Sequence, residues 1–139
     1  MLKIGMTAAF ASLAFAGAAA ATDLSGLWQT GDGRGQVQIS PCDGSLCGRL
    51  VIDKPLPDNP AEVDIKNKNP ALRTRSLKGL LILQGFHQDG DAWIGGSIYD
   101  PSDGGTYKAN LTPTGPTTMT VRGCIFVPLC KTQTWTRLR

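Results

Sequence analysis

The chain of 139 residues corresponds to one domain, or to one domain with a short appendage. Its net charge of +3 is too small to indicate nucleic-acid binding, and its single histidine excludes sites that need two. Seventeen glycines and nine prolines, which follow no period, favour short strands and turns over a helical bundle.

Residues 1–21 have the composition of a signal peptide. Lys3 is the positively charged start, residues 6–18 are apolar and rich in small side chains, and alanines precede a cleavage site before Thr22. Because an alanine-rich stretch this short spans a bilayer poorly, we predict cleavage and no stable membrane anchor afterwards. The mature protein is then a single domain of residues 22–139, and it is periplasmic or secreted.

Export predicts that the four cysteines form disulfides. Cys42 and Cys47 are separated by four residues, and Cys124 and Cys130 by five. Of the three connectivities that four cysteines allow, local pairing is the most economical, because the turn after Pro41 can bring Cys42 back onto Cys47. The alternative is a four-cysteine zinc site, which usually has closer cysteine pairs and occurs mostly in reducing compartments.

Turn signals divide the rest of the chain into eight strand-like runs. The runs are 26–30, 35–40, 46–52, 79–86, 92–99, 106–111, 117–122 and 132–138. One long irregular loop, from Asp53 to Pro70, follows the third run, and its only helical signal is one turn near 61–66. The stretches 87–91 and 123–131 are expected loops. Eight antiparallel neighbours favour an all-β, up-and-down barrel, because closure removes exposed sheet edges. A sandwich is the alternative.

The two ends of this domain carry a recognisable pair of features. Gly26 and Trp28 open the first strand, and Arg137 closes the last. Trp28 can plug one end of a barrel, and Arg137 can stack on the indole and donate hydrogen bonds to carbonyls of the first strand. This arrangement resembles the closed end of calycin barrels, which include the lipocalins and fatty-acid-binding proteins.

The resemblance extends along the whole mature chain. The segments that carry it are GLW at 26–28, VQISPC at 37–42, LCGRL at 46–50, NPALRTR at 69–75, GL at 79–80, WIGGSIYDP at 93–101, GTY at 105–107 and TWTR at 134–137. They are similar to the small exported bacterial family called domain of unknown function 2147. The resemblance implies a lipocalin-like barrel and a periplasmic or secreted location, but no reaction. Members often lack Cys124 and Cys130, so the second disulfide rests on spacing alone.

A basic stretch without acids, residues 66–78, contains the first candidate ligand-binding residues. Arg73 and Arg75 point to the same side if the segment is extended, and two guanidinium groups can bind a carboxylate or phosphate. Asp64 and Asn69 can orient them. The alternatives are a solvated strand edge, arginines that pair with acids to hold the long loop, and side chains that cap turns.

Aromatic side chains supply the second set of candidates. At alternate positions, Trp93, Gly95, Ser97 and Tyr99 share one side of their strand, and Tyr107 begins the next. This pattern predicts a small pocket with hydroxyl groups inside it. Aromatic filling of the core is the alternative in so small a barrel.

These residues favour a binding protein for a small, partly apolar molecule, which is anionic if Arg73 and Arg75 contact it. The alternative is a protein-interaction module, such as a periplasmic inhibitor or envelope-assembly factor, that uses the loop from Asp53 to Pro70. The sequence contains no nucleophile–base pair, metal-ligand cluster or cofactor motif, so we expect no enzyme, no cofactor and no metal.

Overall fold

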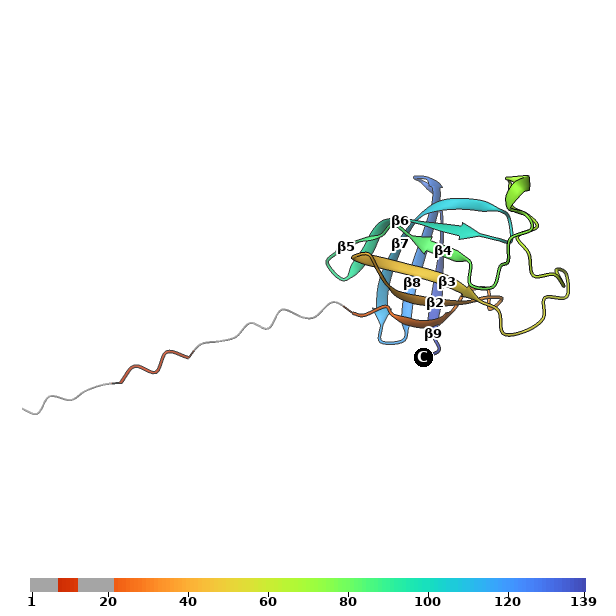
Figure 1. The fold of residues 1–139 in the computed structure, drawn as a ribbon. Helices are drawn as coiled ribbons and strands as arrows, with labels where there is room; N and C mark the ends of the chain where they lie inside the picture. The colour runs from red at the N-terminus through yellow and green to blue at the C-terminus, as the bar shows by residue number, and fades with distance from the viewer. Residues whose placement is uncertain (1–7, 13–21) are drawn as a thin grey trace, which may run out of the picture.

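The computed structural model describes residues 8–12 and 22–139, so most of the predicted signal peptide, with its cleavage site, lies outside the described residues. In the two described ranges, no helix is both long and apolar enough to cross a membrane. Residues 22–139 form nine strands and one 3₁₀ turn (Figure 1). These elements are β1 (Gly26–Gln29), β2 (Gln36–Cys42), β3 (Ser45–Val51), η1 (Pro70–Leu72), β4 (Leu81–Gln84), β5 (His87–Asp89), β6 (Ala92–Asp100), β7 (Gly105–Gly115), β8 (Thr118–Phe126) and β9 (Leu129–Arg137).

The strands form one antiparallel sheet that closes on itself. Consecutive strands pair except β4 and β5, the first strand β1 pairs with the last strand β9, and β4 pairs with β6. The short strand β5 follows β4 and also pairs with β6, so the two together act as one of eight barrel strands. The predicted eight-stranded up-and-down barrel is confirmed, and the closure excludes a sandwich.

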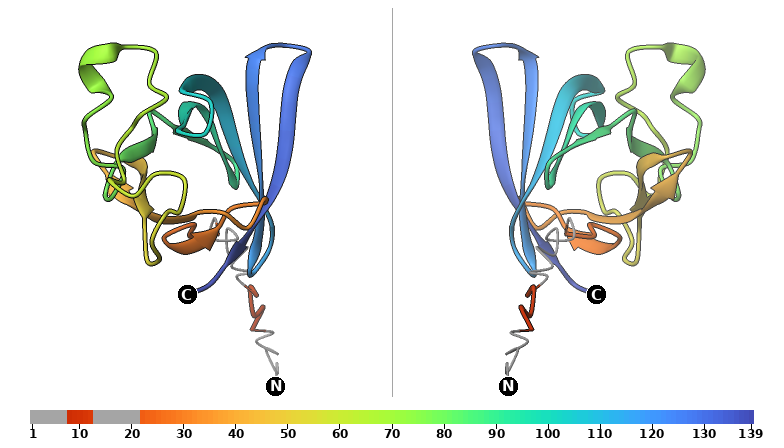
Figure 2. Two further views of the ribbon diagram at one scale, coloured as in Figure 1. Left: turned by 90° about the vertical axis from the view of Figure 1, so that its right-hand side faces the viewer. Right: turned by 90° about the vertical axis from the view of Figure 1, so that its left-hand side faces the viewer.

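The connections alternate between the two ends of the barrel. Those at 30–35, 52–80, 101–104 and 127–128 lie at one end, and the start of β1 and the end of β9 lie at the other. Figure 2 shows that the strands converge towards the termini and diverge towards the opposite end. There the long connection between β3 and β4 and the β8–β9 hairpin project on opposite sides.

Two predicted loops are wrong. Residues 123–131 continue the β8–β9 ladder, in which Cys124 lies opposite Cys130 and Phe126 opposite Leu129. Residues 87–91 supply strand β5 and only a short turn. The ladder continues because antiparallel neighbours keep pairing until a tight turn reverses the chain, and neither cysteine nor a run of apolar residues interrupts that pairing.

The predicted helical turn near 61–66 is also wrong, because the helical turn of this connection is η1. Pro70 begins η1 with a fixed φ, and the Asn69 side chain accepts a hydrogen bond from the Ala71 amide at 3.1 Å. Asn69 therefore acts as a capping residue.

Both predicted disulfides form within the local pairs. Cys42 and Cys47 are bonded, as are Cys124 and Cys130, and no described cysteine is free. The four-cysteine zinc site is therefore excluded, since a disulfide sulfur is not a thiolate ligand. Each disulfide braces the end of one hairpin.

The end of the barrel near the termini is filled by Trp28. Its side chain is fully buried, and its indole Nε1 donates a hydrogen bond to the Leu24 carbonyl at 2.9 Å. The Arg137 guanidinium lies 4.6 Å from the centre of this indole and donates to two backbone carbonyls that precede β1. Stacking and hydrogen bonding together hold the first and last strands at this end.

The seam between β1 and β9 also uses the last residues of the chain. The Leu27 amide donates to the Arg139 carbonyl at 2.7 Å, and the Leu138 amide donates to the Leu27 carbonyl at 2.7 Å. Gly26 has φ of +140°, and a Cβ there would lie 2.5 Å from the Arg139 oxygen. Only glycine allows β1 and the C-terminal residue to approach this closely.

Candidate functional site

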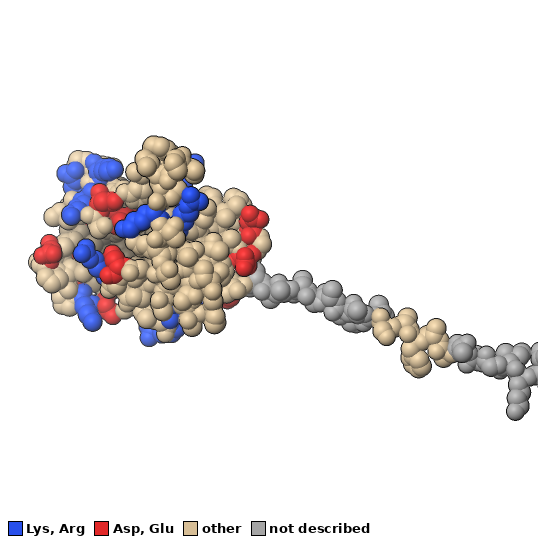
Figure 3. All heavy atoms as spheres, turned by 180° about the vertical axis from the view of Figure 1, so that it is seen from behind, with Lys and Arg blue, Asp and Glu red and all other residues tan. Residues whose placement is uncertain are grey.

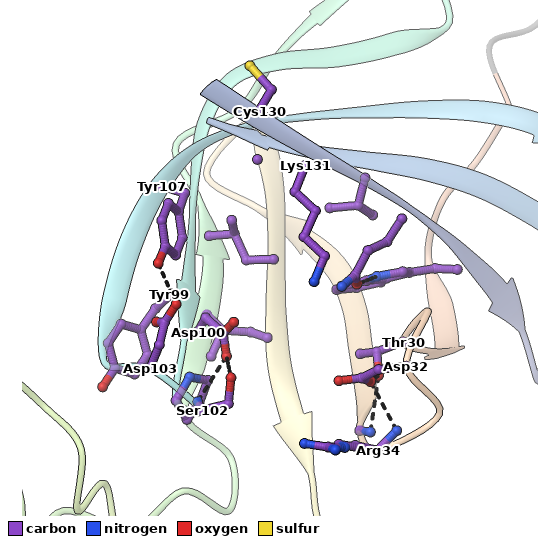
Figure 4. Close-up of a pocket in the computed structure, with 18 of the residues that line it drawn as sticks. Thr30, Asp32, Arg34, Tyr99, Asp100, Ser102, Asp103, Tyr107, Cys130 and Lys131 are labelled. Atoms are coloured by element: carbon purple, nitrogen blue, oxygen red, sulfur yellow. Dashed lines mark hydrogen bonds between the residues drawn. The ribbon is translucent and has the colours of Figure 1, made fainter. Parts of the chain in front are cut away.

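The opposite, open end of the barrel contains a cavity of about 580 Å³. Its apolar lining is Leu50, Ile82, Ile98, Val121 and Trp135, and the polar groups near its mouth include Arg34, Asp32, Asp100, Asp103, Tyr107 and Lys131 (Figure 4). The β8–β9 hairpin contributes Ile125, Pro128 and Leu129. This volume suits one small molecule, since ligand cavities commonly measure about 300–1,000 Å³.

The inward faces of β8 and β9 explain why the barrel is hollow at this end. Along β8 the inward positions run from a buried methionine at 119 through Val121 to Gly123, which has no side chain. On β9 the residues opposite are Trp135, Gln133 and Lys131, in that order. Bulk therefore decreases and polarity increases from the closed end towards the mouth.

Lys131 is the charged group that enters the cavity from β9. Figure 4 shows its side chain pointing into the space between the strands. The described residues contain one ion pair within 4.0 Å, which joins Arg75 to Asp64. The Lys131 ammonium therefore has no carboxylate partner among them. An anionic group in the cavity could therefore bind it.

The carboxylates at the mouth are occupied by donors from their own turns. Asp32 accepts hydrogen bonds from the Thr30 hydroxyl at 2.6 Å and from the Arg34 amide at 3.0 Å. Burial raises the pKa of Asp32, but these bonds and the Arg34 charge together outweigh burial. The pKa of Asp32 therefore lies below its ordinary value. Asp32 is thus ionised and already bonded.

The second mouth turn holds its carboxylates in the same way. Asp100 accepts from the amide and hydroxyl of Ser102, and Asp103 accepts from the Gly105 amide and the Tyr107 hydroxyl (Figure 4). No group of three His, Cys, Asp or Glu in the described ranges could hold a metal ion. The mouth acids are therefore occupied in shaping these turns, whereas Lys131 has no carboxylate partner among the described residues.

Arg73 and Arg75 do not line this cavity. The Arg75 Nε atom donates to Asp64 at 2.8 Å, and the Arg73 Nε atom donates to the Asn67 carbonyl at 2.8 Å. The expectation that both arginines face one ligand assumed an extended segment, but Arg73 has helical backbone angles at the end of η1. Figure 3 shows the basic groups of this end of the molecule interspersed with acids.

Asp64 is the centre of a buried polar network that attaches the long connection to β6. Its side chain, in a residue only 1% exposed, accepts from the Tyr99 hydroxyl at 2.6 Å, the Asn67 amide at 2.8 Å and Arg75. Burial raises the pKa of Asp64, but the three donors together outweigh it and hold the pKa below the ordinary value. The carboxylate is therefore ionised and fully bonded.

Two further contacts fix the same connection. The Arg75 guanidinium lies 5.3 Å from the centre of the Tyr99 ring. Gly104, with φ of +73°, lies so close to the Lys66 carbonyl that a Cβ would overlap that oxygen. The long connection thus packs against the backbone of the β6–β7 turn, which only glycine permits.

The three predicted aromatic residues do not share one inner face. Trp93 lies opposite Leu111, but the register shifts before Gly96, which lies opposite Ala109. This bulge reverses the alternation that the sequence suggested. Ile98 and Tyr107, which are opposite each other, face the cavity.

Tyr99 and Trp93 consequently have other roles. The Tyr99 hydroxyl points away from the cavity, towards the long connection (Figure 4). Trp93 is half-buried and packs against the barrel core without lining the cavity. Of the predicted aromatic pocket, Tyr107 lines the mouth with its ring, and Tyr99 contributes only from the rim.

Arg34 and Lys131 are mouth residues that the sequence analysis missed. The sequence contains a signal for each of these two positions. Connections at one end of an up-and-down barrel alternate along the sequence, which assigns 30–35 and 127–128 to the same end. Lys131 also continues the alternation of Trp135 and Gln133, but a loop over residues 123–131, as expected from the sequence, gives its side chain no inward direction.

Both tyrosines are expected to remain protonated well above pH 10 in the folded protein. Burial, and then the bond to Asp64, raises the pKa of Tyr99 to about 12; the bond to Asp103, and then burial, raises the pKa of Tyr107 to about 12. A free tyrosine has a pKa of about 10. Ultraviolet titration should therefore show tyrosinate near pH 10 only after unfolding in urea. Y99F and Y107F assign the two transitions, and a native transition near pH 10 for either would contradict its bond.

The barrel is similar to known proteins over most of its length. A family profile described as "Uncharacterized protein conserved in bacteria (DUF2147)" matches residues 26–137, which span every strand. Among solved structures, the chain resembles protein HP1028 of Helicobacter pylori, described as belonging to the lipocalin family, with a TM-score of 0.73 and 26% identity over 85% of this chain and 84% of that one. No curated protein sequence matches the chain.

Proposed function

The chain belongs to the DUF2147 family of uncharacterized bacterial proteins, and from this premise we propose that it binds one small amphiphilic molecule in the open end of its barrel. The molecule has an apolar part and an anionic group. The observation that supports this proposal is Lys131, which points into a largely apolar cavity and has no carboxylate partner in the described part of the chain.

The two parts of the cavity favour different parts of such a ligand. The apolar part contacts Leu50, Val121 and Trp135, where burial of about 25 cal/mol per Å² of apolar surface stabilises binding. The anionic group reaches Lys131 and accepts a charge-assisted hydrogen bond. A neutral apolar molecule would use only the first of these contributions.

We also propose that the protein is periplasmic or secreted and that it binds its ligand without catalysis. Two disulfides are typical of an oxidising compartment, which supports a periplasmic or secreted protein. A binding role without catalysis is supported by the mouth carboxylates, each already bonded within its own turn. Interaction with another protein through the loop from Asp53 to Pro70 stays a prediction.

Two related fluorescent probes test the proposed ligand chemistry. Anilinonaphthalene sulfonate is anionic, whereas phenylnaphthylamine has a similar aromatic body without charge. We expect both to bind, and we expect K131Q to weaken the anionic probe by about tenfold, because one charge-assisted hydrogen bond contributes about 1.5 kcal/mol. Titration of probe fluorescence with protein gives both dissociation constants.

Two control variants make the result specific. K108Q removes an exposed lysine from β7, outside the cavity lining, and should leave both probes unaffected. G123L places a large side chain where even a Cβ would lie 3.6 Å from Ile98 and Tyr107, and should abolish binding of both probes. Equal loss of both probes in K131Q would refute an anionic site, and undiminished binding in G123L would place the ligand elsewhere.

A further inference from the structure

The tip of the β8–β9 hairpin is an exposed apolar surface. Ile125, Phe126, Val127 and Leu129 are 64%, 60%, 73% and 55% exposed. They are contiguous around the turn, whereas the other large exposed apolar residues of the barrel are isolated at positions 65, 72 and 138. A contiguous apolar surface of this kind marks an interaction site. We call these four residues the apolar tip.

The fold holds the apolar tip away from the barrel. The hairpin projects beyond the other strands at the open end (Figures 1 and 2). The disulfide between Cys124 and Cys130 joins its two strands just below the tip, and the ladder continues to Phe126 and Leu129. The tip is therefore pre-organised in its exposed position.

The charged residues of the strands that carry the tip are all basic. All eleven acids of the chain precede Gly104, and residues 104–139 contain five positively charged residues. Two of these, Lys108 and Arg122, are exposed on β7 and β8, where Lys108 lies opposite Cys124 at the base of the tip. An anionic surface is complementary to this arrangement.

We propose that the apolar tip inserts into the surface of an anionic phospholipid bilayer, with Lys108 and Arg122 at the level of the phosphate groups. From Cys124 to the turn the strand advances about 10 Å, at roughly 3.3 Å per residue, which matches the depth of interfacial insertion, about 5–10 Å. Exposed apolar side chains surround the whole turn, which fits immersion in lipid better than contact with a flat protein surface.

This docking places the cavity mouth at the membrane surface. Ile125 and Leu129 belong both to the apolar tip and to the cavity lining, whereas Phe126 and Val127 belong only to the tip. Substitution of Phe126 and Val127 therefore tests membrane docking without altering the lining of the proposed ligand cavity. If both hold, an amphiphile passes between bilayer and cavity without crossing open water.

Vesicle co-sedimentation tests the proposal. The experiment uses residues 22–139, which contain every strand and every buried core residue. The apolar segment before Thr22 is left out because it could bind lipid itself. Vesicles contain phosphatidylcholine alone or in equal parts with phosphatidylglycerol. We expect binding to the mixed vesicles, weaker binding at high salt, and about tenfold or greater loss in F126S/V127S. The matched control I65S changes an equally exposed isoleucine on the long connection and should bind as the unmodified protein does.

The outcomes separate the alternatives. Binding that is lost in F126S/V127S and retained in I65S supports the proposal, and an unchanged circular dichroism spectrum of F126S/V127S shows that the barrel is intact. Equal vesicle binding by all three proteins, or no binding to mixed vesicles, overturns it. Analytical ultracentrifugation tests whether a second copy of the chain covers the tip. A dimer that is lost in F126S/V127S, together with no vesicle binding, would assign the tip to that second copy.

Discussion

Replacement of Trp28 by alanine is expected to lower the free energy of unfolding by about 4 kcal/mol, as is typical when a large buried aromatic side chain is removed. The side chain is fully buried, its Nε1 bonds the Leu24 carbonyl, and Arg137 stacks on its ring. All three contributions disappear together. Since domains of this size are stable by about 5–15 kcal/mol, W28A should be near the limit of folding, and urea unfolding followed by circular dichroism measures the change.

Two variants control for the general effect of losing a tryptophan. W28F keeps an aromatic ring at the closed end but loses the hydrogen bond and part of the indole volume, so its cost should lie above about 1 kcal/mol and below that of W28A. W93A removes a tryptophan that is only half-buried and does not stack on Arg137, so it should cost less than W28A. A cost for W93A as large as that of W28A would show that Trp28 has no special role in closure.

Replacement of Asp64 by alanine is expected to cost about 3 kcal/mol, because it leaves the Tyr99 hydroxyl, the Asn67 amide and Arg75 without their common acceptor. The cost is below that of a completely buried ion pair because the Arg75 side chain is 36% exposed. Hydrogen exchange should show loss of protection in residues 62–77, where the long connection is attached. D58A alters an exposed acid of the same connection and should stay within about 0.5 kcal/mol.

The same substitution should change the acid stability of the protein. The pKa of Asp64 is lower in the folded state than the value of about 3.9 expected after unfolding. Its contribution is therefore complete above that value and is lost as the pH falls through the lower, folded pKa. Unfolding free energies measured from pH 6 to pH 2 should fall less steeply in D64A than in the unmodified chain. An identical slope would mean that Asp64 is not bonded as the structure shows.

The barrel was predictable because its signals are local. Alternation of apolar and polar residues identified most strands, and glycine-, proline- and aspartate-rich turns separated them. The β8–β9 tip escaped because its apolar residues do not alternate, so a paired ladder has the appearance of a loop. The bulge in β6 escaped because it depends on a positive φ at Gly95, which spacing does not reveal.

The candidate site was predicted less well than the fold. Arg73 and Arg75 were identified as a pair, but their side chains face Asn67 and Asp64, and that choice depends on how the long connection folds back on β6. The alternative that these arginines hold the long loop describes the observed contacts. Lys131 needed the true length of β9, since a lysine in a loop carries no inward direction.

The pairing of the first strand with the last has a consequence for the nascent chain. Arg137 bonds the Ser25 carbonyl across 112 positions of sequence, so this contact waits until the chain is complete. Until then β1 and β8 are open sheet edges, which can pair with strands of other chains. A chain that stops before Leu129 would keep those edges permanently, and aggregation, rather than a looser barrel, is its expected fate.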